Sequence, residues 1–292
     1  MPRILAINAL RFGAVGFHMH CVVNEWSEDD PIVRQVLDDQ FDEDESLAIW
    51  YYLARQAQNG SLMIDVGAYA GLYSLVAAIA NAEIRVAAFE AAAVTYGRLV
   101  ANIMLNGMEG RICGAHLAAW DREAAVRLPH RYGIYSMCPG ESATFDQPVD
   151  HIEHLFGIPL DSVLKGAPDT RGSFASKSLG VTSAERVAAV KIDVGGAEER
   201  VIDGAREIMA RDRCFILCEI LSASRLEALT AKAAALDYRV DRVGEERNYL
   251  LSPTERYDNF LLGYQAWIAA LPGRLHLTGS RVHQIEAFPT TG

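Results

Sequence analysis

Acidic residues and glycines follow a short apolar segment at residues 62–64 in a pattern that suits a nucleoside ligand. Ligands bind beyond the carboxyl ends of parallel strands, and a glycine such as Gly67 lets the backbone approach the ligand closely. Gly71 would let the following helix pack close to its strand. The expected ligand-binding turn comprises Asp65, Gly67, Ala68, Tyr69 and Gly71.

Glu90 ends the next apolar segment, residues 84–89. A carboxylate at this position can accept hydrogen bonds from both hydroxyls of a ribose, and it would repel a ribose 2′-phosphate. A glycine turn after a first strand is by itself a weak signal, because any parallel α/β protein can have one. Together with Glu90, the turn favours an adenosine ligand with a free ribose.

The spacing within the turn discriminates between adenosine cofactors. A dinucleotide motif, G-x-G-x-x-G, uses its second glycine to admit the pyrophosphate, whereas Tyr69 occupies that position here. S-adenosylmethionine (SAM) has no phosphate and is compatible with Tyr69. Asp65 would help to position the SAM ammonium, directly or through water, and backbone N–H groups of the turn would take its carboxylate. The motif therefore predicts SAM as the cofactor.

Three further residues could act on a methyl acceptor. Methyl transfer mainly requires alignment of the acceptor with the methyl group, and a hydroxyl acceptor must also lose a proton. Asp193 ends an apolar segment and is a candidate base or orienting group, although capping a helix that begins near Ala197 is almost equally favoured. Glu219 ends a later segment and is a second candidate, or else a salt-bridged strand end. Lys191 shares a strand face with Asp193, so it could pair with Asp193, orient substrate or be structural.

Trp120 and Asp121 follow the expected third strand, where an adenine ring would lie. Trp120 could stack on that ring or simply pack in the core, and Asp121 could contact the exocyclic amine. Ala91, next to Glu90, completes the expected cofactor-binding set.

A possible metal site involves His151 and His154, which would share one face of a helix, with Glu153 nearby. No third ligand is positioned by the sequence, so a solvated helix face is favoured and no metal is expected. His116 is a weaker candidate for chemistry.

Apolar segments alternate with segments of helical periodicity from residue 61 onwards. This alternation implies a parallel sheet with right-handed crossovers, and strands that are apolar throughout imply helices on both faces. Two late strands, near residues 238–243 and 257–264, are expected to close the sheet. The predicted fold class is α/β: a Rossmann-like, central, mostly parallel seven-stranded sheet with helices on both faces and an antiparallel closing strand. The expected earlier strands lie near residues 62–64, 84–89, 111–119, 187–192 and 214–218.

The expected domain organisation has a central SAM-binding domain at residues 61–265. Residues 1–60 are expected to form an N-terminal helical extension, and residues 266–292 a C-terminal tail. Prolines mark a loop-rich insertion at about residues 129–186. A short helix near residues 149–156 and a mobile segment at 166–183 are expected within it.

Composition narrows the range of partners. The formal charge of −11 and the lack of a basic stripe disfavour a nucleic-acid substrate. No stretch reaches the roughly 20 apolar residues of a membrane span. Arg11 and His18 interrupt the apolar N-terminal residues, which favours an ordinary folded N-terminus over a secretory signal. The five cysteines lack metal-site spacing and are expected to be reduced in a cytoplasmic protein.

Several of these segments resemble the FkbM-type methyltransferases, a branch of the class I SAM-dependent enzymes. The resemblance covers roughly residues 60–264, and its most specific part is Lys191-Ile192-Asp193-Val194-Gly195-Gly196-Ala197-Glu198, continuing to Val201-Ile202-Asp203-Gly204-Ala205. Other matching segments are Ile64 to Ser74, Phe89-Glu90, Asn102 to Gly107, Pro159-Leu160-Asp161 and Asp258-Asn259-Phe260-Leu261.

The resemblance implies the class I methyltransferase fold and O-methylation of a hydroxyl on a polyketide, sugar or related small molecule. Two departures from the family pattern stand out: Gly195 replaces a glutamate, and Ala91 replaces a proline. Losing the glutamate removes a charge beside the expected active site. It could alter the choice of substrate or mark a weakened enzyme.

Two alternative functions are compatible with parts of the sequence. A nucleotide-dependent Rossmann oxidoreductase would explain the glycine turn and Glu90, but it fits Tyr69 poorly. A noncatalytic SAM-binding protein would be consistent with Gly195 and Ala91.

Overall fold

The computed structural model describes residues 4–23, 31–130, 151–165 and 179–286. Its centre is a seven-stranded sheet in the order β11-β12-β10-β9-β3-β4-β5. The strands from β10 to β5 are parallel, and β12 runs antiparallel to both β10 and β11. The sheet strands are β3 (Leu62–Val66), β4 (Arg85–Glu90), β5 (Ile112–His116), β9 (Val187–Ile192), β10 (Phe215–Glu219), β11 (Tyr238–Arg242) and β12 (Asn248–Pro253).

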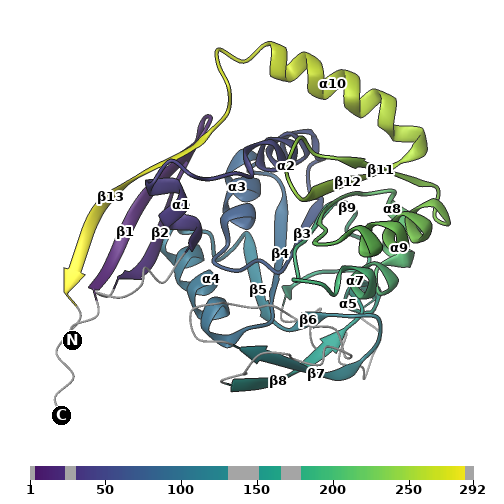
Figure 1. Cartoon of the computed structure of the whole chain (residues 1–292), viewed down its shortest axis with the longest axis horizontal. Coiled ribbons are helices and arrows are strands. Elements are labelled where there is room, and N and C mark those ends of the chain that lie inside the picture. Colours follow the sequence, from purple (N-terminus) through teal and green to yellow (C-terminus); the bar gives the residue numbers. More distant parts are fainter. Residues whose placement is uncertain (1–3, 24–30, 131–150, 166–178, 287–292) are drawn as a thin grey trace.

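The order of strands explains where a ligand can bind. The chain enters the middle of the sheet at β3, extends outward through β4 to β5, and then returns to the other side of β3 with β9 (Figure 1). The carboxyl ends of β3 and β9 therefore diverge at a topological switch point, where open α/β sheets bind ligands. This arrangement confirms the predicted class I methyltransferase fold.

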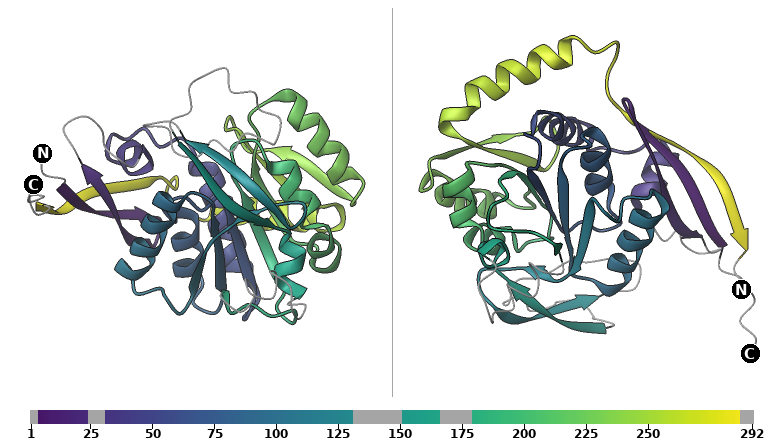
Figure 2. Two further views of the ribbon diagram at one scale, coloured as in Figure 1. Left: turned by 90° about the horizontal axis from the view of Figure 1, so that it is seen from below. Right: turned by 180° about the vertical axis from the view of Figure 1, so that it is seen from behind.

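Two layers of helices cover the two faces of the sheet (Figure 1, Figure 2). Side chains alternate along each strand: Met63 packs into the core beneath α2, α3 and α4, whereas Ile64 packs into the core of the opposite layer. Both faces are buried, which accounts for strands that are apolar throughout. The first layer comprises α2 (Asp44–Gln56), α3 (Leu72–Ala80) and α4 (Ala93–Leu105); the second comprises α5 (Leu160–Lys165), α7 (Glu198–Asp203), α8 (Arg206–Asp212) and α9 (Ala223–Ala234).

The prediction of a closing strand at residues 257–264 is wrong. These residues lie in α10 (Tyr257–Ala269), which follows a short 3₁₀ turn, η1 (Thr254–Arg256), and β12 closes the sheet instead. Phe260, Tyr264 and Trp267 recur at helical spacing and pack their rings on one another and on Tyr52. The segment Asp258 to Leu261, which resembled the closing strand of the family, therefore begins a helix.

The expected helix near residues 149–156 is also wrong. The residues from His151 lie in β8 (His151–Ile158), which pairs with β7 (Ala124–His130) and β6 (Ala118–Ala119) in a small second sheet. Leu155 lies opposite Val126 in the antiparallel register, and both are buried against Trp120. Pairing with a distant strand thus overrides the local pattern. The expected helix start at residues 149–150 and most of the expected mobile segment, residues 166–178, lie outside the described residues.

The terminal segments form a third sheet in the order β13-β1-β2, rather than a helical extension and a tail. Its strands are β1 (Ile4–Phe12), β2 (Val15–Val23) and β13 (Leu277–Glu286), so both ends of the chain meet on one side of the molecule (Figure 1, Figure 2). Alternate residues of β1, from Ala6 to Phe12, are buried. The two expected helices after residue 30 are present as α1 (Pro31–Leu37) and α2.

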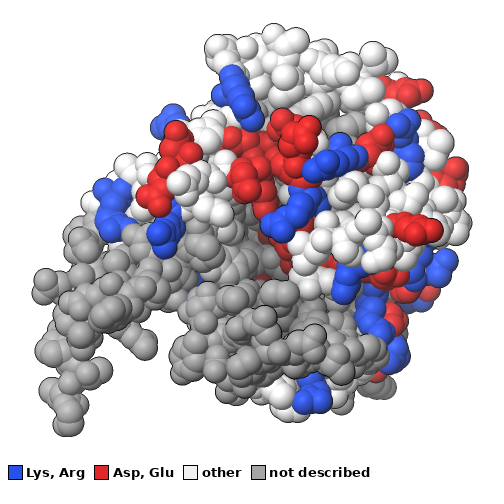
Figure 3. Space-filling view, in the orientation of Figure 1, with Lys and Arg blue, Asp and Glu red and all other residues white. Residues whose placement is uncertain are grey.

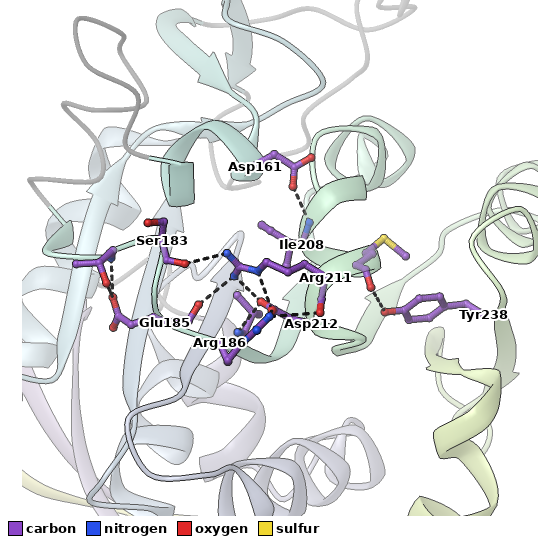
Figure 4. Close-up of polar contacts among 11 residues, drawn as sticks. Asp161, Ser183, Glu185, Arg186, Ile208, Arg211, Asp212 and Tyr238 are labelled. Carbon is purple, nitrogen blue, oxygen red and sulfur yellow. Dashed lines mark hydrogen bonds and ion pairs between the residues drawn. The ribbon is translucent and has the colours of Figure 1, made fainter.

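Polar contacts at the amino ends of the strands hold β9 in place (Figure 4). Asp161 accepts hydrogen bonds from the backbone N–H groups of Glu207 and Ile208 at the start of α8. Arg211, near the end of that helix, donates to the carbonyl groups of Ser183 and Glu185 just before β9. Asp161 of the family-like segment therefore joins the start of α5 to the start of α8. Among the described residues, no helix is both long and apolar enough to span a bilayer.

Candidate functional site

A cleft opens beyond the carboxyl ends of β3, β4 and β9, at the switch point of the sheet. The empty volume of this cleft, counted together with the open solvent at its mouth, is about 440 Å³. Five of its lining residues were predicted from the sequence: Gly67, Glu90, Ala91, Trp120 and Asp193. The full lining is Val66, Gly67, Phe89, Glu90, Ala91, Leu117, Ala118, Ala119, Trp120, Leu128, Asp193, Val194 and Ala197.

Gly67 connects the two halves of this cleft, one at the ends of β3 and β4 and the other at the end of β9. Its φ of +76° lies in the left-handed region, and a Cβ atom there would lie 1.8 Å from the carbonyl oxygen of Asp193. The Asp193 N–H in turn donates to the carbonyl of Val66 (2.9 Å). Glycine was predicted here so that a ligand could approach, but the backbone of Asp193 also requires it.

Glu90 is 2% exposed and its carboxylate is held from three sides. One oxygen accepts from the Tyr69 N–H (2.8 Å), and the other accepts from the Ala92 N–H (2.9 Å) and the Thr95 hydroxyl (2.7 Å). Burial raises the pKa of Glu90, although these three donors oppose the rise. Because a carboxylate has about four lone-pair sites, these three hydrogen bonds leave about one site for a further donor.

Most N–H groups of the glycine turn are already used within the protein, so they do not form the predicted cradle for a ligand carboxylate. Gly67 and Ala68 both donate to the carbonyl of Phe89, Tyr69 donates to Glu90, and Gly71 donates to Ala68. Sequence spacing revealed the turn but not Phe89 and Glu90, the partners that come from the neighbouring strand. An anion site of the kind found in dinucleotide-binding loops is therefore absent from this turn.

Asp65 lies beneath the cleft rather than along it. Its carboxylate is 1% exposed and accepts a hydrogen bond from the Ser74 hydroxyl (2.6 Å). Burial raises the pKa of Asp65 to about 6, while the Ser74 hydrogen bond and the charge of Lys191 lower it. Gly71, with φ of +94°, brings the start of α3 against Leu99 of α4, while α3 also packs on β3 and β4. Ala68, Tyr69 and Gly71 do not line the cleft either.

Trp120 forms one wall of the cleft. The chain makes room for it with two glycines: a Cβ atom on Gly157 would meet its side chain at 2.8 Å, and one on Gly204 would meet its carbonyl oxygen at 1.9 Å. The Arg200 guanidinium lies over the Trp120 ring at 4.9 Å and pairs with Asp121 at 2.7 Å. Asp121 is thereby held beside the wall but does not line the cleft. The buried Trp120 indole nitrogen lacks a hydrogen-bond partner among the described residues.

The three residues expected to act on an acceptor come together at the ends of β9 and β10. The Lys191 ammonium lies 3.4 Å from the Asp193 carboxylate, which is 36% exposed. Burial raises the pKa of Glu219 to about 8, reinforced by the charge of Asp193 and a hydrogen bond with it, while Lys191 and Arg247 lower it. Asp193 does not cap α7, because Ala197 occupies the N-cap position and no side chain bonds there. The alternative role predicted for Asp193 is therefore wrong.

Sequence reasoning missed three residues around Lys191. Asn248 accepts a hydrogen bond from the ammonium (3.3 Å), and the Tyr73 ring lies 5.0 Å from it. The Tyr73 hydroxyl donates to Glu43 (2.8 Å), which precedes α2. Asn248 faces Glu219 in the register of β10 and β12, so only the pairing of strands could have revealed it.

Acidic side chains gather near the middle of the face that carries α2, with basic side chains beside them (Figure 3).

The histidines do not form a metal site within the part of the chain that the structure describes, where no group of three or more candidate ligands occurs. His151 and His154 lie on a strand, so their side chains point to opposite faces. Glu153 instead accepts from the Ala93 N–H at the start of α4 and contacts His116 at 3.0 Å. It therefore links β8 to the central sheet.

Comparisons with known proteins place the chain near methyltransferases. No family model matches it. Over 157 residues, 50% of this chain, it is 27% identical to methyltransferase sdnD of Sordaria araneosa, and this match spans 60% of that relative. Similar solved structures include methyltransferase FkbM from Methylobacillus flagellatus KT, with 14% identity, a TM-score of 0.46, and coverage of 70% of this chain and 47% of that chain. Another is precorrin-6y C5,15-methyltransferase from Geobacter metallireducens GS-15, with 12% identity, a TM-score of 0.41, and coverage of 71% and 85%.

Proposed function

We propose that this protein is a SAM-dependent methyltransferase that methylates a hydroxyl oxygen of a small molecule, such as a sugar or a polyketide-type metabolite. The observation that carries this proposal is that Glu90 and Asp193 line one cleft on either side of Gly67. A ribose-binding carboxylate and a proton-accepting carboxylate thus flank the place where a nucleoside cofactor and an acceptor would meet. The curated relative is itself named a methyltransferase, which supports the proposed reaction class.

The residues of the cleft fit SAM. Glu90 can accept a hydrogen bond from a ribose hydroxyl. Trp120 lines the cleft and its indole N–H has no partner among the described residues, so a ring nitrogen of adenine could accept from it. Ala91 contributes a small wall beside Glu90. The engaged N–H groups of the turn leave no cradle for a pyrophosphate, which favours SAM over a dinucleotide. When bound, SAM supplies an activated methyl group.

The carboxyl pair of Asp193 and Glu219 would manage the acceptor proton. Near neutral pH, Glu219 holds a proton because burial and the Asp193 charge raise its pKa to about 8. Asp193 is the more exposed of the two and lines the cleft, so it is the group that would accept the hydroxyl proton. Lys191 balances the charge of the pair from a buried position.

The acceptor is proposed to be a small molecule rather than a nucleic acid. The net charge of −11 would repel a phosphate backbone.

Calorimetric titration with SAM and with NAD tests the cofactor. We expect heat release with SAM alone, and binding of NAD alone would instead favour the oxidoreductase alternative. Methyl transfer is then measured by mass spectrometry over a panel of hydroxylated sugars and polyketides.

Asp193→Asn is expected to keep SAM affinity and to lose roughly 100-fold or more in turnover, because a general base typically contributes that much. If Asp193→Ala and Glu219→Ala both leave turnover intact, the roles of the carboxyl pair are wrong. Tight SAM binding without transfer to any acceptor would point to a noncatalytic SAM-binding protein.

A further inference from the structure

Lys191 is an ammonium buried among more carboxylates than it can neutralise. Its side chain is 1% exposed, and it contacts Asp193 at 3.4 Å, Asn248 at 3.3 Å and the Tyr73 ring at 5.0 Å. A flexible lysine in such surroundings needs a fixed acceptor to choose one position. The carboxyl groups whose charges act on it are Asp193, Glu43, Glu219 and Asp65, and the buried Cys218 thiol, whose pKa is raised by burial, lies nearby.

Asn248 is suited to provide that fixed acceptor. It is 1% exposed, and its carboxamide has one partner on each side. The oxygen accepts from Lys191, and the nitrogen donates to Glu246 at 3.4 Å. An ammonium has only donors and a carboxylate only acceptors, so a side chain that bridges them must offer one of each. Asparagine meets this requirement, and the two partners fix the orientation of its amide.

Glu246 connects this arrangement to the first helical layer. Its carboxylate accepts from the backbone N–H groups of Glu45 (2.9 Å) and Ser46 (3.2 Å) in the first turn of α2. These groups lack partners within the helix, and a carboxylate there is also favoured by the helix dipole. A continuous chain of contacts therefore runs from α2 through Glu246 and Asn248 to Lys191.

We propose that Asn248 is a positioning residue, which holds the Lys191 ammonium between Asp193 and Glu219 and prevents it from moving toward Glu43. This inference rests on the proposed function, in which Asp193 accepts the acceptor proton. The ammonium already lies over the Tyr73 ring at 5.0 Å. Without Asn248, it would move along that ring toward Glu43, which the Tyr73 hydroxyl contacts. The carboxyl pair would then lose much of its compensating charge.

The test is a pH titration of Glu219 in the absence of SAM and acceptor. The titration is monitored by NMR of protein whose glutamate carboxyl groups are labelled with ¹³C. The Glu219 signal is identified by its loss in Glu219→Gln. Lys191→Met should raise the pKa of Glu219 above about 8, since the compensating charge is removed. Asn248→Leu, of similar volume, should move it in the same direction by ~0.5 pH unit or more. Asn248→Ser, a milder change, should do so to a smaller extent.

A buried asparagine elsewhere provides the control. Asn102 is 0% exposed and donates to the carbonyl of Ala70, away from the carboxyl pair. Asn102→Leu should destabilise the fold without moving the Glu219 titration. An unchanged titration in both Asn248 variants, or an equal shift in Asn102→Leu, would overturn the proposal. The titration and the methyl-transfer assay are separate measurements. An unchanged Glu219 titration would contradict only the role of Asn248, and an absence of methyl transfer would contradict only the proposed function.

Discussion

The cleft is built from two halves of the same sheet edge that treat their carboxylates in opposite ways. At the ends of β3 and β4, Glu90 is fully buried and receives three hydrogen bonds from the protein. At the ends of β9 and β10, Asp193 is 36% exposed and shares its surroundings with Glu219, whose pKa is raised to about 8. In the first half, hydrogen bonds fix the position of the Glu90 carboxylate. In the second half, a proton bound to the carboxyl pair of Asp193 and Glu219 reduces its negative charge. Under the proposed function, binding and proton transfer would thus be separated between neighbouring strands.

The largest expected effect comes from breaking the point where the halves meet. Gly67→Ala places a Cβ atom 1.8 Å from the Asp193 carbonyl oxygen, and neither backbone can yield without disrupting a strand end. We expect a loss of roughly 4 kcal/mol or more in unfolding free energy, together with loss of SAM binding. Denaturant unfolding and calorimetry measure the two effects.

Gly60 offers a matched control for this substitution. Its φ of +77° equals that of Gly67 within one degree, but a Cβ atom there meets nothing within 4 Å. Gly60→Ala should therefore cost only the backbone strain, roughly 1–2 kcal/mol. Equal losses in the two variants would mean that φ alone, and not the contact with Asp193, requires glycine at position 67.

The next effect separates the two halves by their hydrogen bonds. Glu90→Ala leaves the Tyr69 N–H, the Ala92 N–H and the Thr95 hydroxyl without their acceptor, at an expected cost of about 3 kcal/mol. Asp193→Asn, in the other half, should change stability by less than about 1 kcal/mol. Thermal unfolding at one pH compares them. A larger loss for Asp193→Asn would reverse the assignment of shape and charge to the two halves.

A smaller effect concerns pH. The pKa of Glu219 is raised from 4.5 to about 8 in the folded protein. The stability from this proton is therefore fully present below pH 4.5 and is lost as pH rises to 8. Because Gln does not titrate, the stability of Glu219→Gln relative to wild type should increase as pH rises across this window.

Glu255→Gln is the control for the pH series. The hydrogen bond from Arg213 lowers the pKa of Glu255 to about 2. Its contribution is complete above pH 4.5 and is lost only as pH falls toward 2. Its stability difference from wild type should therefore be flat between pH 4.5 and 8. A flat difference for Glu219→Gln as well would remove the contrast between the two halves of the cleft.

The parts of the fold that could be predicted from sequence depend on local patterns. Apolar runs ending in Asp65, Glu90 and Asp193 marked the central strands and the edge that carries the site. The terminal sheet could not be found in this way, because β1 pairs with β13 from the other end of the chain. β12 was missed because Leu250 and Leu251 form a short run after several charged residues.

The same distinction applies to the site. Strand ends indicated Glu90, Asp193 and Glu219, since such positions can be read from a single segment. Asn248 carries no local signal, because its place beside Lys191 depends on the antiparallel register of β12 with β10. Phe89 and Glu90, which accept from three N–H groups of the glycine turn, likewise come from β4. Sequence patterns thus located the groups, but strand pairing determined what remained available for a ligand.

The smallest expected effect is that of Tyr69→Gly. This variant tests whether the Tyr69 ring or the engaged N–H groups of the turn would prevent a pyrophosphate from binding in the first half of the cleft. Tyr69 has a φ of +51°, which is uncommon for a residue other than glycine. Tyr69→Gly relieves this conformation but loses the ring and adds chain entropy, so stability should change by less than about 1 kcal/mol. NAD should still fail to bind by calorimetry, because Gly67, Ala68 and Gly71 keep their N–H groups engaged. NAD binding by Tyr69→Gly would instead show that the ring alone blocks the dinucleotide. The hydrogen-bonded shape of this half would then be less important for cofactor choice than a single side chain.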